Sequence, residues 1–330
     1  MYPFLSNYSD RKRAPCLTYA VTTCFILSLW WTEIACAGQK ITIITSSDLP
    51  AYQLAAAELG RQLAENGMSS SHPTDFWLLD DVKAKSATAA MIEREDVVVT
   101  VGSAAADYAV HHFVSSRIVC SFITRNAFDV ITADASPDNA ITAVFIDQPI
   151  KRLIQISTLL RKDQSVYKIG MLSQSVLAEP SLAIDASAAN NDIEINSTSL
   201  LLTGNPIKQI EPLMKNSDVF IVRPNTSLFN RLVAKLVLQL SMRYKTPVIG
   251  FSEKYAKAGA LLSVYASPEN IGWDTGLLLS EWMQDPSNAT PVPRDGSEFS
   301  LVINQRIARK LSITLDAEQL KSTLQKMEGK

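Results

Sequence analysis

This chain contains two successive series in which short β-branched runs alternate with helical segments. This alternation limits the possible folds more than any other feature. The clearest run, Asp96–Val101, is apolar after its first residue, as expected of a parallel strand that is covered on both faces. Strands that alternate with helices indicate parallel sheets with helices on both sides. We therefore predict an α/β protein with two Rossmann-like, doubly wound lobes joined by a multi-strand hinge.

The two series of strands are similar in size. The first series is predicted at residues 40–45, 76–79, 96–101, 117–122 and 141–146, and the second at residues 167–172, 193–199, 218–222, 248–251 and 260–265, with a last strand at 299–303. We expect the first lobe to span residues 38–146, completed by part of 275–330, and the second lobe to span 147–274. No glycine- or serine-rich linker separates them, which favours strands crossing a hinge over a flexible tether.

The first 37 residues have the composition of a secretory signal. Arg11–Arg13 supplies a positive region, Tyr19–Trp31 an apolar region, and Ala35–Ala37 a cleavage site of the A-x-A type. We predict cleavage after Ala37 and a periplasmic protein. Two alternatives stay open: a lipoprotein attached through Cys36, and an uncleaved anchor formed by the uncharged residues 14–32.

Composition narrows the class of partner. The chain has 330 residues, of which 47% are hydrophobic and 19% charged, and its net charge is −2. These values fit a soluble globular protein and give no bias toward nucleic acid. Cys120 is the cysteine that remains after the predicted signal, so we expect no intramolecular disulfide and a buried, inert thiol.

Signatures of catalysis and of cofactor binding are absent from the sequence. It has no G-x-x-x-x-G-K-S/T loop, no G-x-G-x-x-G turn and no G-x-S-x-G elbow. His111 and His112 are adjacent, so on a helix they point about 100° apart and cannot share one metal ion. We expect neither an enzyme nor a metal or cofactor site; a periplasmic hydrolase is a rival that lacks a nucleophile–base pair.

Small polar residues follow the predicted strands in both halves of the chain. Hydroxyl groups and backbone N–H groups at helix N-termini are suited to holding an anion, and an arginine can grip a carboxylate at two points. Ligands of open α/β sheets bind beyond the carboxyl ends of the strands. The candidate ligand-binding residues are Ser46, Ser47, Ser103, Thr124, Arg125, Ser173, Arg223, Asn225 and Ser252, together with Tyr265, which could stack on a ligand. Taken singly, each hydroxyl is more often a plain helix cap.

Three stretches of the chain carry a family resemblance. They are Asp96–Ser103, Thr246–Leu261, and Phe299–Asn304 with the Ala308–Leu311 helix. With them the sequence resembles the substrate-binding proteins of ABC transporters, in the TrpX-like group, over nearly the whole mature chain. It departs from the family pattern at residues 118–126 and 142–143, where members shape the ligand pocket.

The resemblance implies a fold like that of the type I periplasmic binding proteins. In this fold two lobes close on a small ligand, often an amino acid or a related compound, for delivery to a membrane permease. It implies that Ser103 caps an anionic group from the first lobe and that the region of Ser252 faces it across the cleft. We expect a monomer that binds a small anionic or zwitterionic solute. The alternative is a periplasmic sensor or accessory protein of the same fold that partners a membrane receptor or an outer-membrane uptake system.

Overall fold

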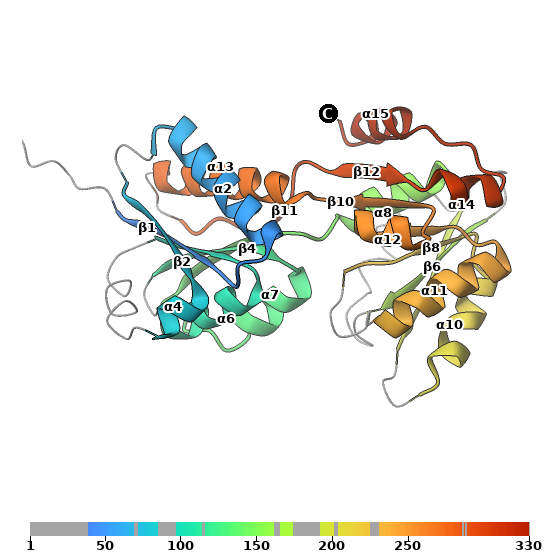
Figure 1. Cartoon of the computed structure of the whole chain (residues 1–330), viewed down its shortest axis with the longest axis horizontal. Coiled ribbons are helices and arrows are strands. Elements are labelled where there is room, and N and C mark those ends of the chain that lie inside the picture. Colours follow the sequence, from blue (N-terminus) through green and yellow to red (C-terminus); the bar gives the residue numbers. More distant parts are fainter. Residues whose placement is uncertain are drawn as a thin grey trace, which may run out of the picture. The chain divides into compact units, whose positions relative to one another are not determined.

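The protein is built on two six-stranded sheets, each with helices on both faces (Figure 1). The computed structural model describes residues 39–68, 72–84, 97–113, 116–161, 166–173, 192–200, 204–224, 231–285, 287 and 289–329. The first sheet contains β1 (Ile41–Thr45), β2 (Thr74–Leu78), β3 (Val97–Val101), β4 (Arg117–Ile123), β5 (Ala140–Phe145) and β11 (Arg294–Asp295). The second contains β6 (Tyr167–Ser173), β7 (Ile193–Ser199), β8 (Val219–Ile221), β9 (Val248–Gly250), β10 (Leu262–Tyr265) and β12 (Ser300–Ile303).

The first sheet is parallel throughout and has the order β11-β5-β4-β3-β1-β2. Its strands are apolar on both faces because alternate side chains enter different cores: Ile41 and Ile43 pack with one set of helices, and Ile44 with the other. One set is α2 (Pro50–Glu65) and α13 (Pro268–Gln284); the other is α4 (Leu79–Ala84), α6 (Ser103–His112) and α7 (Arg125–Thr132) (Figure 1).

The second sheet repeats this plan in the order β12-β10-β9-β8-β6-β7, and only β12 pairs antiparallel. The helices on one face are α8 (Ile150–Thr158), α14 (Gln305–Lys310) and α15 (Ala317–Met327). The helices on the other face are α10 (Pro206–Lys215), α11 (Arg231–Tyr244) and α12 (Glu253–Ala258). The predicted fold class, an α/β protein with two doubly wound units, is confirmed.

Strand order places one switch point in each sheet. The order reverses between β1 and β3 in the first sheet and between β6 and β8 in the second. At such a point the loops that follow two neighbouring strands run in opposite directions, which opens a crevice at the carboxyl ends of the strands. Ser46 and Gly102 follow the strands at the first switch point, and Ser173 and Val222 lie at the strand ends of the second.

Three connecting segments join the two sheets. They are residues 146–149 between β5 and α8, residues 266–267 between β10 and α13, and residues 296–299 between β11 and β12. Thus α13 packs on α2 of the first sheet, whereas β12 and the helices after it belong to the second sheet. The lobe limits given above, 38–146 and 147–274, stay predictions.

Some local predictions need correction or cannot be placed. The helix α7 and the two-residue strand β11 were not predicted. The sequence also predicts an alanine-rich helix that ends at residue 92, before β3, and a second helix at residues 177–189. In the structure α4 ends at Ala84; the rest of the first predicted helix and all of the second lie outside the described residues. No helix among the described residues is long and apolar enough to cross a membrane; the predicted signal lies outside them.

Candidate functional site

The switch point of the first sheet gathers Ser46, Gly102 and Ser103. The hydroxyl of Ser46 accepts a hydrogen bond of 2.9 Å from the backbone N–H of Ala105, in the first turn of α6. Gly102 holds the N-cap position with φ 98°, where a side chain is disfavoured, and a Cβ there would lie 2.6 Å from Ser46 Oγ. The alternative role of Ser103 given above, that of a plain helix cap, is therefore wrong: Ser103 is the first helical residue, it is exposed, and Ser46 provides the cap.

Two aromatic residues border this switch point. Tyr52 in the first turn of α2 and Phe122 near the end of β4 meet edge to face, with ring centroids 5.4 Å apart. Phe122 has φ 54° and sits where the pairing of β4 with β5 shifts register. A left-handed conformation is costly for a bulky residue, and such strain tends to be kept at functional positions. Sequence reasoning missed both residues, because neither follows a strand directly.

Thr124 and Arg125 start α7 beside the first connecting segment. Thr124 Oγ1 accepts from the N–H of Ala127 at 3.2 Å and so caps the helix. The backbone N–H of Arg125 donates to Asp147 Oδ2 at 2.7 Å, and its guanidinium donates to Asp295 Oδ1 at 2.8 Å. The same guanidinium lies over the ring of Phe145, 4.1 Å from the centroid. Arg125 thus links the ends of β4, β5 and β11.

Asp147 is the most deeply placed charge of this region, with 3% of its surface exposed. Burial raises the pKa of its carboxyl above the usual value, while the Arg125 N–H and the Arg223 guanidinium lower it and Asp295 raises it further. Arg223 follows β8 of the second sheet, so one carboxylate interacts with arginines from both halves of the chain. Asp147 could have been found from the sequence, because it follows a strand and precedes a helix, as many of the candidate ligand-binding residues do.

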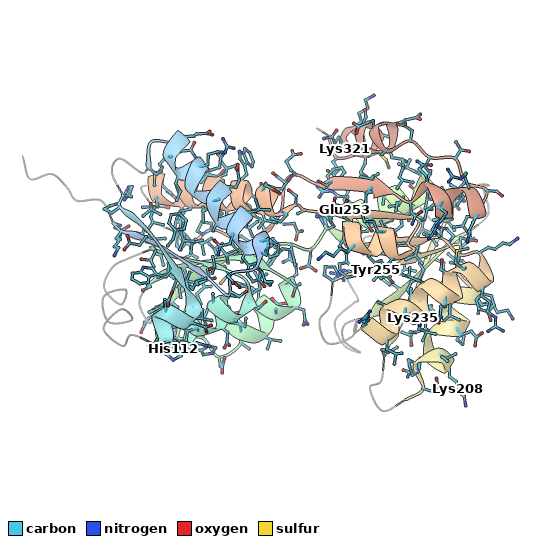
Figure 2. All side chains as sticks on the ribbon, viewed as in Figure 1. His112, Lys208, Lys235, Glu253, Tyr255 and Lys321 are labelled. Atoms are coloured by element: carbon cyan, nitrogen blue, oxygen red, sulfur yellow. The ribbon has the colours of Figure 1, made fainter. Side chains whose placement is uncertain are left out.

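The carboxyl ends of β9 and β10 carry Ser252 and Tyr265. Ser252 caps α12 by accepting from the N–H of Tyr255 at 3.2 Å. Glu253 and Tyr255 both stand on this short helix (Figure 2), and the ring of Tyr255 stacks on that of Phe251 at 5.4 Å. Tyr265 is half-buried; burial raises its pKa, and the negative charge of Glu253 adds to this effect.

The remaining candidates are placed less completely. Ser47 follows Ser46 and is half-buried, and Ser173 is the last residue of β6. Asn225 lies outside the described residues.

Across all candidates, the structure brings Ser46 together with Gly102 and Ser103, and Thr124 and Arg125 together with Asp147 and Arg223. A role of any of them in ligand binding stays a prediction.

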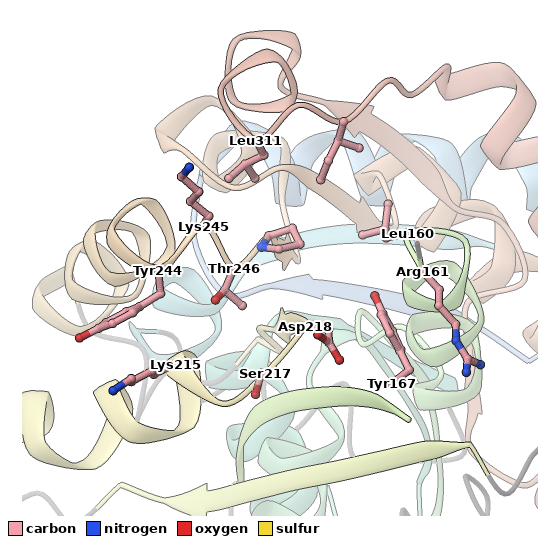
Figure 3. Close-up of a pocket in the computed structure, with 12 residues that line it drawn as sticks. Leu160, Arg161, Tyr167, Lys215, Ser217, Asp218, Tyr244, Lys245, Thr246 and Leu311 are labelled. Carbon is pink, nitrogen blue, oxygen red and sulfur yellow. The ribbon is translucent and has the colours of Figure 1, made fainter. Parts of the chain in front are cut away.

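Two cavities occur in the second half of the chain. A small one, about 10 Å³, lies at the ends of β8, β9 and β10, next to the first connecting segment. A larger one, about 290 Å³, lies at the opposite, amino ends of β6, β8 and β9; Arg161, Lys215 and Lys245 are among its lining residues (Figure 3). None of the predicted ligand-binding residues within the described part of the chain lines the larger cavity. Because ligands of such sheets bind at the carboxyl ends, we expect the ligand on the side of the small cavity.

Metal-binding and thiol chemistry find no site in the described part of the chain. It contains no group of three or more His, Cys, Asp or Glu side chains that could hold a metal ion. Cys120 is fully buried, and burial raises the pKa of its thiol to about 12, so the thiolate form is strongly disfavoured. The prediction that Cys120 is a small core residue is confirmed.

Comparison with solved structures supports the fold. A ligand-free, open substrate-binding protein with adhesive properties from Clostridium difficile is 16% identical with a TM-score of 0.63, covering 85% of this chain and 97% of that one. A domain from Streptococcus pneumonia in complex with L-Trp is 18% identical with a TM-score of 0.53, covering 86% and 98%. A conserved domain protein from Vibrio cholerae is 18% identical with a TM-score of 0.52, covering 86% and 97%.

The sequence itself matches one family model. No curated protein matches the chain, but the model described as ABC transporter substrate binding protein matches residues 40–327. This family is non-enzymatic and typically extracytoplasmic, and it implies a transporter as partner. The match covers both sheets, all three connecting segments and the helices that follow β12, so the chain belongs to the ABC transporter substrate-binding protein family.

Proposed function

We propose that this protein binds a small zwitterionic or anionic solute, such as an amino acid, between its lobes and delivers it to the membrane permease of an ABC transporter. The observation that carries the proposal is the placement of Asp147, which is 3% exposed and interacts with Arg125 and Arg223. A carboxylate next to guanidinium groups complements the ammonium and carboxylate groups of an amino acid. Buried charges in proteins are also usually paired with a group of opposite charge.

Further residues support the same kind of ligand. Ser46 and Gly102 bring a hydroxyl and the N-terminus of α6 to the switch point, and helix N-termini favour anions. The half-buried pair of Tyr52 and Phe122 offers an apolar surface for the carbon part of a solute. The L-Trp complex of the similar streptococcal domain is consistent with this chemistry, although the likeness concerns the fold. We also propose export to the periplasm with cleavage after Ala37.

A thermal-shift screen of the proteinogenic L-amino acids and small carboxylates tests the proposal, alongside mass spectrometry of compounds that co-purify. A ligand at about 100 times its Kd adds roughly 2.7 kcal/mol to stability, which raises the melting temperature measurably. Absence of any such rise with well-folded protein would contradict the proposal.

Substitution of the central carboxylate provides the matched test. Asp147→Asn should weaken binding of the best ligand roughly 30-fold, about 2 kcal/mol, because a buried charge pair with the ligand is lost. Asp129→Asn, an exposed position on α7, is the control and should leave affinity unchanged. Equal affinity of the wild type and Asp147→Asn would remove Asp147 from the site.

A further inference from the structure

Gln148 is a buried amide in the segment that joins β5 to α8, with 5% of its surface exposed. Its Oε1 accepts a hydrogen bond of 2.8 Å from Arg152 Nη1. A guanidinium only donates, so this contact determines which end of the amide is oxygen. The Nε2 group consequently points away from Arg152, and it has no hydrogen-bond partner among the described residues.

Arg152 is itself held in place by residues from the end of the chain. Both carboxylate oxygens of Glu328 accept from it, Oε1 from Nε and Oε2 from Nη2 at 3.0 Å. The guanidinium also lies 4.5 Å from the ring centroid of Phe299, in the third connecting segment. With 5% of the Arg152 side chain exposed, rotation away from this position is blocked. Because Glu328 and Phe299 hold Arg152, and Arg152 donates to the amide oxygen, the orientation of the Gln148 amide is fixed.

Gln148 lines the small cavity described above, at the ends of β8, β9 and β10. Its other lining residues carry no polar side chain: Ile146, Leu153, Val222, Pro224, Gly250, Phe251 and Val264. At about 10 Å³ it has room for one atom-sized polar group. A buried water needs two to four polar partners, and among the described residues Gln148 supplies the one polar side chain that lines this cavity. A ligand atom held by the rest of its own molecule has no such requirement.

We propose that Nε2 of Gln148 donates a hydrogen bond to an acceptor oxygen of the bound solute, a carboxylate or carbonyl oxygen, at this subsite. Gln148 is then a specificity-determining residue, and Arg152 and Glu328 are positioning residues that keep its donor directed toward the ligand. A solute that presents an ammonium or other donor group there is rejected, because donor would face donor. This inference rests on the proposed function, since it names one contact of the same ligand.

The test compares wild type, Gln148→Glu and Gln148→Met by isothermal titration with the tightest-binding compound of the amino-acid and carboxylate screen. Gln148→Glu keeps the acceptor for Arg152 but replaces the donor by a second acceptor. We expect at least about tenfold weaker binding for Gln148→Glu and about fivefold weaker binding for Gln148→Met, the range for one buried hydrogen bond. Gln319→Met, an exposed position on α15, should bind like the wild type.

A second readout separates a lost donor from a disturbed fold. As the pH falls, the Gln148→Glu carboxyl gains a proton and can donate again, so its affinity should recover relative to the wild type at the same pH. If Gln148→Glu does not fold, Gln148→Met decides. Affinities within twofold of the wild type in Gln148→Met, or a liganded crystal structure with only a water at Nε2, overturn the inference alone. Failure of every compound to bind the wild type overturns the proposed function, and this inference with it.

Discussion

Asp274 in α13 accepts two hydrogen bonds from Ser297, one from the backbone N–H at 2.9 Å and one from the hydroxyl. Ser297 belongs to the third connecting segment, and α13 begins directly after the second. Next to Ser297, a Cβ on Gly296 would lie 3.3 Å from Asp274 Oδ2 and 3.8 Å from the Cβ of Ala266. The Asp274 carboxylate, in a residue that is 2% exposed, therefore ties the third connection to α13, and Gly296 of that connection lies close to Ala266 of the second.

Ser297→Ala should lower the free energy of unfolding by about 2 kcal/mol at neutral pH, because a hydrogen bond to a buried charged group is lost. Urea denaturation measures this difference. Ser287→Ala is the matched control: Ser287 makes the same pair of contacts to Asp285, but on the exposed surface, and its loss should cost little. Equal losses in the two variants would contradict a structural role for the buried pair.

The effect of Ser297→Ala should depend on pH in a defined direction. Burial raises the folded-state pKa of Asp274 above the ordinary value of 3.8, against the lowering effect of the Ser297 donors. The hydroxyl donor stabilises the ionised form, so its loss matters above the folded pKa and fades as the pH falls through that pKa toward 3.8. Denaturation at a series of pH values should therefore show the two proteins converging in acid; a constant difference would refute the assignment.

Helix α13 approaches α2 closely at Gly272 and Gly276, two glycines that were not singled out from the sequence. A Cβ on Gly272 would lie 2.3 Å from the carbonyl oxygen of Ala55, and a Cβ on Gly276 2.6 Å from the Cβ of Gln62. Both positions are buried in a helix of the usual hand, so close packing and not backbone conformation requires glycine. The spacing of four residues puts both on one helix face.

Gly272→Ala should destabilise the protein by roughly 1–3 kcal/mol, since the neighbouring backbone would have to move. Gly60→Ala in α2 is the control: its new Cβ would meet only the ring of Phe76, which is 55% exposed and can shift. The control should be neutral or slightly stabilising, because alanine favours a helix more than glycine does. Thermal unfolding of the two variants distinguishes these outcomes, and a neutral Gly272→Ala would mean that the helices can separate at no cost.

The sequence predicted the fold well because its strands carry the strongest physical signal. Val97–Val101 forms β3, which is buried at every position, because a short β-branched apolar run favours a strand that is covered on both faces. The strand β11 was not predicted because Arg294 and Asp295 are polar and only these two residues pair. Its pairing with β5 depends on the tertiary fold and leaves no local pattern.

The site was predicted less well for a related reason. Local reading assigns a helix cap to the nearest serine, Ser103, whereas the actual cap is Ser46, which lies 59 residues before Ala105 in the sequence. Asp147 and Gln148 follow a strand as clearly as the selected residues do, but Asp147 depends on Arg125, 22 residues before it. Gln148 depends, through the nearby Arg152, on Glu328, which lies 176 residues beyond Arg152. Such partners become visible only once the strands are ordered.

The difference between the two serines is directly measurable. Ser46→Ala should lower stability by about 1 kcal/mol, because the N–H of Ala105 loses its acceptor. Ser103→Ala should change stability by less than about 0.5 kcal/mol, since this exposed hydroxyl does not cap the helix. Chemical denaturation of both variants tests the assignment, and the reverse order of effects would show that Ser103 is the cap after all.

The contact between Glu328 and Arg152 should make the end of the chain important for stability. Their side chains are 13% and 5% exposed, so Glu328→Gln leaves a buried arginine without its carboxylate, a change that costs about 3 kcal/mol in buried pairs. Glu318→Gln removes a charge of the same kind from the exposed face of the same helix and should cost little. Urea unfolding compares the two, and high salt should not abolish the difference, because buried pairs are weakly screened. If Glu328→Gln unfolds like the control, Arg152 is held by Gln148 and Phe299 alone, and the C-terminal residues do not orient the amide.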